Sequence, residues 1–352
     1  MNYWLIFGVG FVLSLIITPI FRWLAYYLGI VDKPEKNGRK RHKKSVAYLG
    51  GLALFVVFLI SLVLFVTLSN HVLMMIGGLV VVVIIGLIDD IYGLKPWQKL
   101  LGQLFIGLLL VVGGIGINSF PLPNGGYIEL NHWVMEFSVG DIVIKIVLLS
   151  AIFTLMWTVF LINSVNFLDG LDGLAGGVSL IAFLIIFALS LSKYVNQSEI
   201  AVMSVIMVGA LMGFLPYNLP SASIFLGDAG SMMLGYVLAV LSILSGGKVA
   251  TLVLVLGIVI LDTLLVIISR IKSGKKIWSA DRLHMHYRLL DRGVKHWQIL
   301  IGYYLVSMAL GLSAVLVPSS FFKLVIWIIF ILVFFYFSYV IMSGKQSNNN
   351  VE

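Results

Sequence analysis

Apolar stretches long enough to cross a bilayer recur along almost the whole chain of 352 residues, and short polar segments separate them. Roughly 20 apolar residues in a helix cross the hydrocarbon core, so each stretch predicts a transmembrane helix. The predicted spans are 3–28, 48–69, 72–88, 98–117, 142–162, 173–192, 199–215, 230–245, 249–269, 299–317 and 321–342. We therefore expect an all-α polytopic membrane protein: a bundle of about eleven transmembrane helices, in one domain over residues 1–344.

Three segments depart from this simple pattern. The first apolar stretch is too long for a signal-peptide core and no small-residue cleavage site follows it, so it is expected to remain as a helix. Between the fourth and fifth spans, Pro121, Pro123 and 124–126 are turn signals beside the alternating residues 127–130, which predicts a small hairpin. The Asn-rich residues 345–352 are expected to form a disordered cytoplasmic tail.

Composition and charge favour a lipid bilayer as the partner, not a nucleic acid. Hydrophobic residues make up 61% of the chain and charged residues 11%, against roughly half and a quarter in soluble domains. The net charge of +8 comes from basic residues that cluster beside the spans. No cysteine is present, which excludes disulfides, thiolate metal sites and a cysteine nucleophile.

The distribution of basic residues predicts the orientation in the cell membrane. One set of alternate loops holds 18 of the 23 Lys and Arg residues and the other set holds three. The richer set comprises 29–47, 89–97 with the flanking Lys99, 163–172, 216–229, 270–298 and the C-terminal tail. By the positive-inside rule this set is cytoplasmic, so the N-terminus is expected outside.

Acidic and amide side chains gather in these cytoplasmic loops. Asp89 and Asp90 end the third span, where adjacent carboxylates repel each other unless a cation or proton lies between them. A solvated helix end is the alternative interpretation of such a pair. Farther along, an amide or acid recurs every third residue from 163 to 172, and glycines follow within the same run, 163–177. Its polar members are Asn163, Asn166, Asp169 and Asp172.

On a helix, that spacing places the four side chains along one side, and the glycines permit close approach to a ligand. The N-terminus of the following span would add a phosphate site. A glycine-rich turn between helices would explain the glycines but not the four polar side chains. The motif at 225–231 adds Phe225, suited to stacking on a base, and Asp228, suited to a divalent ion, shortly after Asn218. By itself such a string is also an ordinary helix-capping turn.

The largest cytoplasmic loop carries the remaining candidates. His284 and His286 are too close in sequence to share a helical face, so the zinc-helix pattern is absent. With the surrounding arginines (Arg282, Arg288 and Arg292) they form a cationic cluster suited to a diphosphate. A basic stripe on anionic lipid headgroups is the alternative. Asp262, inside the ninth span, is either functional or a structural acid bonded to a neighbouring helix, and we favour the structural interpretation.

Carboxylates, amides and bases at one membrane surface are the groups that a Mg²⁺-diphosphate reaction needs. A transporter would instead place broken helices and polar residues near the middle of the bilayer. A CDP-alcohol phosphotransferase would carry an arginine after its Asp-Gly-x-x-Ala motif, whereas Leu-Ala-Gly-Gly follows Asp172-Gly173 here. A membrane enzyme acting on a lipid is therefore the preferred hypothesis.

At these residues the chain resembles the polyprenyl-phosphate N-acetylhexosamine-1-phosphate transferases, in their WecA/TagO branch. The resemblance extends from the loop 39–42 and Gly50-Gly51 to Arg292, and several motifs occur in order. These are Asp89-Asp90, 98–103, 163–177, 225–231, Asp262-Thr263 and the histidine loop. The resemblance implies a ten- or eleven-helix bundle whose cytoplasmic cleft joins UDP-GlcNAc to undecaprenyl phosphate and releases UMP.

The resemblance also implies roles for individual residues. Asp228 resembles the ligand of Mg²⁺, with Mn²⁺ as an alternative, and Asp89 and Asp90 resemble the pair that engages the lipid phosphate. Asp169, Asn218 and Phe225 resemble uridine contacts, and Lys99, His284 and His286 resemble diphosphate contacts. Our candidate catalytic residues are Asp89, Asp90 and Asp172. The candidate substrate-binding residues are Lys99, Asn163, Asn166, Asp169, Asn218, Phe225, Arg282, His284, His286 and Arg292.

The histidine loop departs from the branch at one position, because Tyr287 stands where a further histidine is common. The related transferase for UDP-MurNAc-pentapeptide is the alternative function, and its loop resembles His-His-His-Phe-Glu. The sequence leaves open the downstream glycan, a GalNAc substrate, the polyprenyl length and the oligomeric state, for which a homodimer is one candidate.

Overall fold

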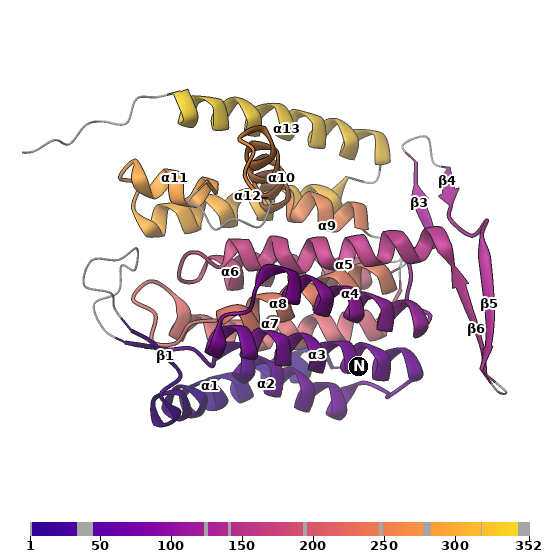
Figure 1. Cartoon of the computed structure of the whole chain (residues 1–352), viewed down its shortest axis with the longest axis horizontal. Helices are drawn as coiled ribbons and strands as arrows, with labels where there is room; N and C mark the ends of the chain where they lie inside the picture. The colour runs from indigo at the N-terminus through magenta and orange to yellow at the C-terminus, as the bar shows by residue number, and fades with distance from the viewer. Residues whose placement is uncertain are drawn as a thin grey trace, which may run out of the picture.

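The computed structural model describes residues 2–33, 45–122, 126–139, 142–192, 196–245, 249–276, 283–317 and 319–343. Within these ranges the chain forms thirteen helices and six short strands. The helices are α1 (Tyr3–Leu28), α2 (Gly50–Phe65), α3 (Asn70–Tyr92), α4 (Pro96–Val112), α5 (Leu148–Leu168), α6 (Leu174–Ser190), α7 (Ser198–Asn218), α8 (Gly227–Leu244), α9 (Val249–Val255), α10 (Gly257–Lys272), α11 (Met285–Asp291), α12 (His296–Leu316) and α13 (Ser320–Ser343). Most of them run side by side in one bundle (Figure 1).

The prediction of an all-α polytopic membrane protein is confirmed, and each of the eleven predicted spans coincides with a helix or a pair of helices. In the described part of the chain, seven helices are long and apolar enough to cross a membrane, and the pair α9–α10 raises the number to eight. The other three, α2, α4 and α6, are apolar but only 16 or 17 residues long. Eleven crossings therefore stay a prediction.

The predicted ninth span is broken. Helices α9 and α10 meet at an angle of 82°, with Leu256 between them. The sequence pattern had predicted one continuous helix, because every residue from Val249 to Ile260 except Thr251 and Gly257 is a large or small apolar one. The bend turns α10 away from α9, and α10 then packs against α5, α12 and α13.

The strands form three separate two-stranded antiparallel sheets. They are β1 (Val31–Asp32) with β2 (Val46–Ala47), β3 (Ser119–Pro121) with β4 (Tyr127–Glu129), and β5 (Val134–Val139) with β6 (Ile142–Val147). The β3–β4 pair confirms the predicted hairpin. The β5–β6 pair corrects the start of the fifth span, because the β-branched residues before Leu148 pair as a strand and do not continue α5.

Helix α8 lies at the centre of the bundle and contacts α2, α3, α5, α6 and α9. Its first turn is approached closely from two sides. A Cβ at Gly51 of α2 would meet the backbone of Gly230, and one at Gly86 of α3 would meet the backbone of Ala229. Only glycine permits these contacts, which fix the first turn of α8 against both neighbouring helices.

Short connections join the ends of α3, α5 and α7 to the starts of α4, α6 and α8, and His296 at the start of α12 lies 3.2 Å from the carbonyl of Asp172. This end of the bundle is opposite to the end that bears β3 to β6, and it also holds β1 and α11 (Figure 1). The polar motifs that the sequence separates by up to two hundred residues are thereby brought to one end.

Candidate active site

An acid–lysine–acid bridge lies at the turn between α3 and α4. Asp89, in the last turn of α3, accepts the backbone N–H of Leu94 at 2.6 Å. Lys99, in the first turns of α4, forms an ion pair with Asp89 and a second one with Asp228 at 2.9 Å. Lys99 therefore balances carboxylates that come from α3 and α8, and it joins two motifs that are 139 positions apart in the sequence (Asp89 and Asp228).

Asp90 has a different environment from its neighbour. Its two carboxylate oxygens accept the backbone N–H groups of Asp228 at 2.7 Å and of Ala229 at 3.1 Å. These groups are among the unpaired donors of the first turn of α8, so Asp90 acts as an N-cap supplied by another helix. Asp90 thus holds the backbone of Asp228, and Asp89 holds its side chain through Lys99.

The amides of α5 extend this cluster inward. Asn166 donates its amide to Asp228 Oδ1 at 2.5 Å and to the hydroxyl of Ser231 at 2.9 Å. Asn163, one turn earlier, donates instead to Gln103 of α4 at 2.6 Å. Asn163 and Asn166 lie on helix α5, which runs on to Leu168, and not in the loop predicted for residues 163–172. Asn166 therefore contacts the acidic cluster directly, whereas Asn163 joins α4 to α5 behind it.

The turn after α5 carries two further acids. Burial raises the pKa of the Asp169 carboxyl well above its ordinary value, and the charges of Asp228, Asp90 and Asp172 raise it further. Several carboxylates therefore share one region, and a bound cation would offset their repulsion. Asp172 itself accepts the backbone N–H of Ala222 at 3.3 Å, which ties this turn to the loop between α7 and α8.

Asn218, predicted to contact uridine, is buried and forms two hydrogen bonds inside the protein. Its Oδ1 accepts the backbone N–H of Gly173 at 3.2 Å, and its amide donates to the carbonyl of Ile224 at 3.0 Å. Tyr304 of α12 donates to the carbonyl of Gly173 at 2.6 Å. Asn218 therefore holds together the start of α6 and the loop that leads to Phe225.

Phe225 has an aromatic partner that the sequence analysis did not single out. The ring of Tyr48 meets the ring of Phe225 edge-on, with centroids 5.8 Å apart. The backbone N–H of Phe225 donates to the carbonyl of Ala47 at 2.8 Å, so the segment before α2 runs beside the loop before α8. Burial, with the charges of Asp90, Asp32, Asp169 and Asp228 in support, raises the pKa of Tyr48 and keeps its hydroxyl a donor.

In the sequence, Tyr48 is marked only as an aromatic residue shortly before Gly50-Gly51. The fold is needed to show that this segment reaches Phe225.

The histidine loop packs on the turn that follows Asp169. A Cβ at Gly170 would lie 2.5 Å from both His286 Nε2 and the hydroxyl of Tyr287. The rings of His284 and His286 are stacked, with centroids 5.7 Å apart and an angle of 12°. The two histidines are separated by one residue, so an extended segment would point both of them the same way. The structure instead places His284 at the start of the short helix α11 and His286 within it.

The arginines of this loop do not share one environment. Arg288 donates to the carbonyl of Leu283 at 2.5 Å, and Arg292 donates to the carbonyl of Ile341 near the end of α13. Arg292 thus joins α11 to α13, and its role in diphosphate binding stays a prediction. Arg282 lies outside the described residues.

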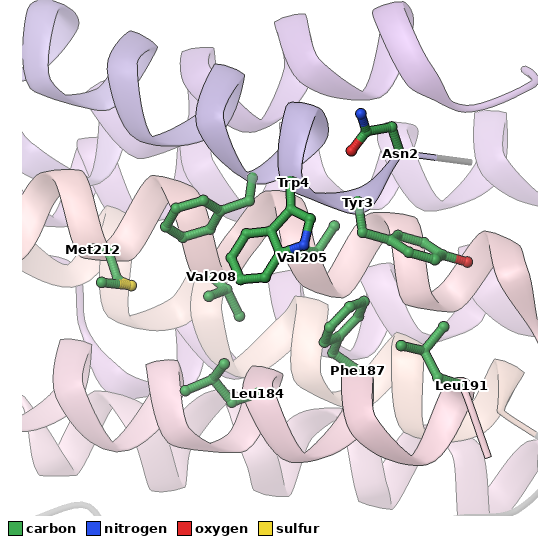
Figure 2. Close-up of a pocket in the computed structure, with 10 residues that line it drawn as sticks. Asn2, Tyr3, Trp4, Leu184, Phe187, Leu191, Val205, Val208 and Met212 are labelled. Atoms are coloured by element: carbon green, nitrogen blue, oxygen red, sulfur yellow. The ribbon is translucent and has the colours of Figure 1, made fainter.

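A large apolar cavity lies elsewhere. It occupies about 880 Å³ between α1, α6 and α7, and Tyr3, Phe187 and Val208 are among the residues that line it (Figure 2). Leu191, which follows α6, also lines it, so the cavity lies toward the end of the bundle opposite to the acidic cluster. Among the described residues that line this cavity, none is charged.

Comparisons with known proteins assign the chain to a family. The sequence model described as "Glycosyl transferase family 4" matches residues 72–246, from α3 to just beyond α8. The "Probable undecaprenyl-phosphate N-acetylglucosaminyl 1-phosphate transferase" of Bacillus subtilis is 32% identical over 336 residues, which cover 94% of this chain and 88% of the relative. The chain belongs to glycosyl transferase family 4. The resemblance stated from the sequence is thereby confirmed.

Two other relatives show the range of the family. The "Decaprenyl-phosphate N-acetylglucosaminephosphotransferase" of Mycobacterium tuberculosis is 34% identical over 321 residues, covering 82% of this chain and 76% of the relative. The "Phospho-N-acetylmuramoyl-pentapeptide-transferase" of Halalkalibacterium halodurans is 30% identical over 325 residues, covering 87% and 94%. The matched region common to the family contains every acid of the cluster around Asp228 described above.

Proposed function

We propose that this enzyme transfers N-acetylglucosamine-1-phosphate from UDP-GlcNAc to undecaprenyl phosphate. An oxygen of the lipid phosphate attacks the phosphorus atom that bears the sugar, and the bond between the two phosphates of UDP breaks. The products are undecaprenyl-diphospho-GlcNAc and UMP. The observation that supports this most strongly is the Asp89–Lys99–Asp228 bridge at one end of a membrane bundle, in a chain whose relatives are named for this transfer.

Lys99 would supply positive charge where the transferred phosphoryl group develops negative charge. Phosphoryl transfer is accelerated mainly by positioning and charge neutralisation, and a lysine between two carboxylates is held in place for both. The second ionisation of a phosphomonoester has a pKa near about 6, so the lipid phosphate needs little help to lose its proton. Asp89 is therefore proposed to orient Lys99 toward the lipid phosphate, not to act mainly as a base.

The donor groups around Asp228 suit a hard divalent cation. These groups are the carboxylate oxygens of Asp228 and Asp89. In the described ranges, no three His, Asp or Glu residues lie close enough to coordinate a metal ion together. Mg²⁺ is often bound through one or two carboxylates, with substrate phosphates and water completing its shell. We propose Asp228 as the ligand of Mg²⁺ or Mn²⁺. The bound ion would neutralise the diphosphate, while Lys99 and Asn166 hold the Asp228 side chain in place.

The nucleotide and its diphosphate are proposed to occupy the space beside this cluster. Phe225 and Tyr48 offer aromatic surface to the uracil, and Asp169 offers a hydrogen-bonding carboxyl group. His284 and His286 are proposed to offer ring nitrogens to the diphosphate, because His286 lies against the turn at Gly170 and the ring of His284 stacks on it. Asn218 is proposed to support the uridine site indirectly, through its hydrogen bonds to Gly173 and Ile224.

The enzyme is proposed to lie in the cell membrane with its N-terminus outside and the acidic end of the bundle in the cytoplasm. The excess of Lys and Arg in the loops at that end supports this orientation. A transporter is less well supported. The described residues contain one broken helix pair, but the acids around Asp228 gather at an end of the bundle and not halfway along it.

Competition between two donors tests this function. The purified protein would receive UDP-GlcNAc and UDP-MurNAc-pentapeptide at equal concentrations with limiting undecaprenyl phosphate, and the lipid products would be resolved by mass. We expect the GlcNAc lipid with stoichiometric UMP. A MurNAc-pentapeptide lipid would assign the chain to the other branch, and absence of UMP release with both donors would exclude the transfer. The mass of the detergent-solubilised protein would test the homodimer.

A further inference from the structure

Asp262 joins α10 to α11 through both oxygens of its carboxylate. Oδ2 lies 2.9 Å from Nδ1 of His284, and Oδ1 accepts the backbone N–H of Met285 at 2.8 Å. All three residues are buried, and Asp262 lies on the arm of the bent pair that leads toward the histidine loop. One carboxylate thus fixes a side chain and the backbone at the start of α11.

A buried acid in a membrane helix is costly unless partners compensate for its lost hydration. Packing alone could be supplied by an apolar residue at this position, as it is at Leu261 beside it. The second bond, to the histidine ring, is the feature that a purely structural tether to Met285 would not require. The geometry therefore indicates that Asp262 holds the side chain of His284 in place.

The ring of His284 is also held by aromatic neighbours. It packs against Phe167 of α5 at a centroid distance of 5.4 Å and against His286 at 5.7 Å. The guanidinium of Arg270 lies 6.0 Å from the centroid of the Phe167 ring. The tilted contact with Phe167 and the stacked contact with His286 restrain the plane of the His284 ring, and the bond at Nδ1 restrains its rotation within that plane.

We propose that Asp262 is a positioning residue that aims Nε2 of His284 at the diphosphate of the nucleotide sugar. An ionised carboxylate can only accept, so it places the shared proton on Nδ1. When Nε2 also carries a proton, the carboxylate stabilises the resulting imidazolium, which can donate a charge-assisted bond to a phosphate oxygen. This inference rests on the proposed function, because it assumes that His284 binds a diphosphate.

The test is a double-mutant cycle on purified full-length protein, with Asp262→Asn, His284→Ala and the double variant. Asn keeps an oxygen for the N–H of Met285 but removes the charge that holds Nδ1. We expect each single variant to raise KM for UDP-GlcNAc at least tenfold, with KM for undecaprenyl phosphate within threefold of the unchanged protein. The double variant should have a KM for UDP-GlcNAc no more than twofold above that of His284→Ala. Thr263→Val, a buried neighbour on α10, is the matched control and should change neither KM more than twofold.

Two results would overturn the inference. The first is an Asp262→Asn variant with unchanged KM for UDP-GlcNAc. The second is a further tenfold rise in this KM when Asp262→Asn is added to His284→Ala. The second result would mean that Asp262 acts only on the fold. If Asp262→Asn does not yield folded protein, Asp262→Ser replaces it in the same cycle with the same expected non-additivity. If the unchanged protein shows no turnover, the proposed function fails, and UDP-GlcNAc binding measured by calorimetry in the same cycle still decides the role of Asp262.

Discussion

The carboxylate of Asp90 accepts the backbone N–H of Asp228, so an acid at the end of α3 holds the first turn of α8. Its neighbour Asp89 contacts Lys99 instead. Two adjacent acids that the sequence presents as a pair therefore have separate partners. Asp90 is bound to backbone on both oxygens, and Asp89 is bound to a side chain that also contacts Asp228.

The first prediction concerns stability. Replacing Asp90 with Ala should leave the first-turn donors of α8 without an acceptor and cost about 1 kcal/mol, the typical loss for an N-cap. The midpoint of thermal unfolding in detergent should fall, and activity should fall with it. Glu199→Gln, an exposed acid in the first turn of α7, should leave the midpoint unchanged. An Asp90→Ala protein as stable as the unchanged enzyme would contradict the capping role.

The second prediction concerns Lys99. Lys99→Met removes the cation between Asp89 and Asp228, and kcat should fall at least about 100-fold, which is roughly 2.7 kcal/mol of barrier. Lys95→Met, an exposed lysine in the same turn, should keep kcat within twofold.

Asp89→Asn should lower turnover while UDP-GlcNAc affinity stays within a few-fold. Weakened nucleotide binding with normal turnover in Asp89→Asn would instead place this acid at the nucleotide.

The third prediction concerns metal dependence. Activity should vanish in EDTA and return with Mg²⁺ or Mn²⁺, because the diphosphate requires a neutralising cation that oxygen ligands can hold. Asp228→Asn should lose nearly all turnover while its unfolding midpoint stays close to that of the unchanged protein. Retention of more than about a tenth of the rate, a loss below roughly 1.4 kcal/mol, would refute ligation by Asp228.

The fourth prediction concerns the contact between the acidic turn and the histidine loop. Gly170→Ala would place a methyl group against His286 Nε2 and the Tyr287 hydroxyl, so the loop must move away. We expect at least a tenfold rise in KM for UDP-GlcNAc with little change in unfolding temperature. Gly302→Ala on α12, where no atom lies within 4 Å of the new Cβ, should be neutral. Equal kinetics for the two variants would separate the histidine loop from the substrate site.

The fifth prediction concerns orientation. The chain has no cysteine, so single cysteines can be introduced without removing any. Cysteine at Ser273, an exposed residue just after α10, should be protected from an impermeant thiol reagent in intact cells. Cysteine at Asn131, exposed between β4 and β5, should be labelled. Labelling of the Ser273→Cys protein from outside would reverse the topology and move the acidic cluster out of the cytoplasm.

Much of the fold followed from hydrophobic length alone. Every predicted span contains a helix, because a run of roughly 20 apolar residues has few alternatives in a bilayer. The break after Val255 was not predictable, since apolar residues continue on both sides of Leu256. The strand β6 was missed for a related reason. Its β-branched residues are as hydrophobic as those of α5, and only the pairing with β5 distinguishes them.

The candidate site was predicted in outline but not in its internal division of roles. Residue types identified Asp228 and Lys99 as chemical groups, and the fold brought them together. Residue types alone could not show that Asn163 donates to Gln103 or that Arg292 reaches the end of α13, because tertiary packing sets those partners. Tyr48 was missed because its relation to Phe225 depends on a backbone pairing across the chain.

The close packing of Gly51 and Gly86 against the first turn of α8 restricts how this enzyme can change over evolution. At each glycine the atoms in nearest contact belong to the main chain of Ala229 or Gly230, and every residue type has a main chain. A larger residue at either glycine therefore has no compensating partner, since no substitution in α8 can make its backbone smaller. Changes in the candidate site would therefore have to arise through side chains around this fixed frame, such as Tyr48 beside Phe225 and Tyr287 beside Gly170, and not through a shift of the helices.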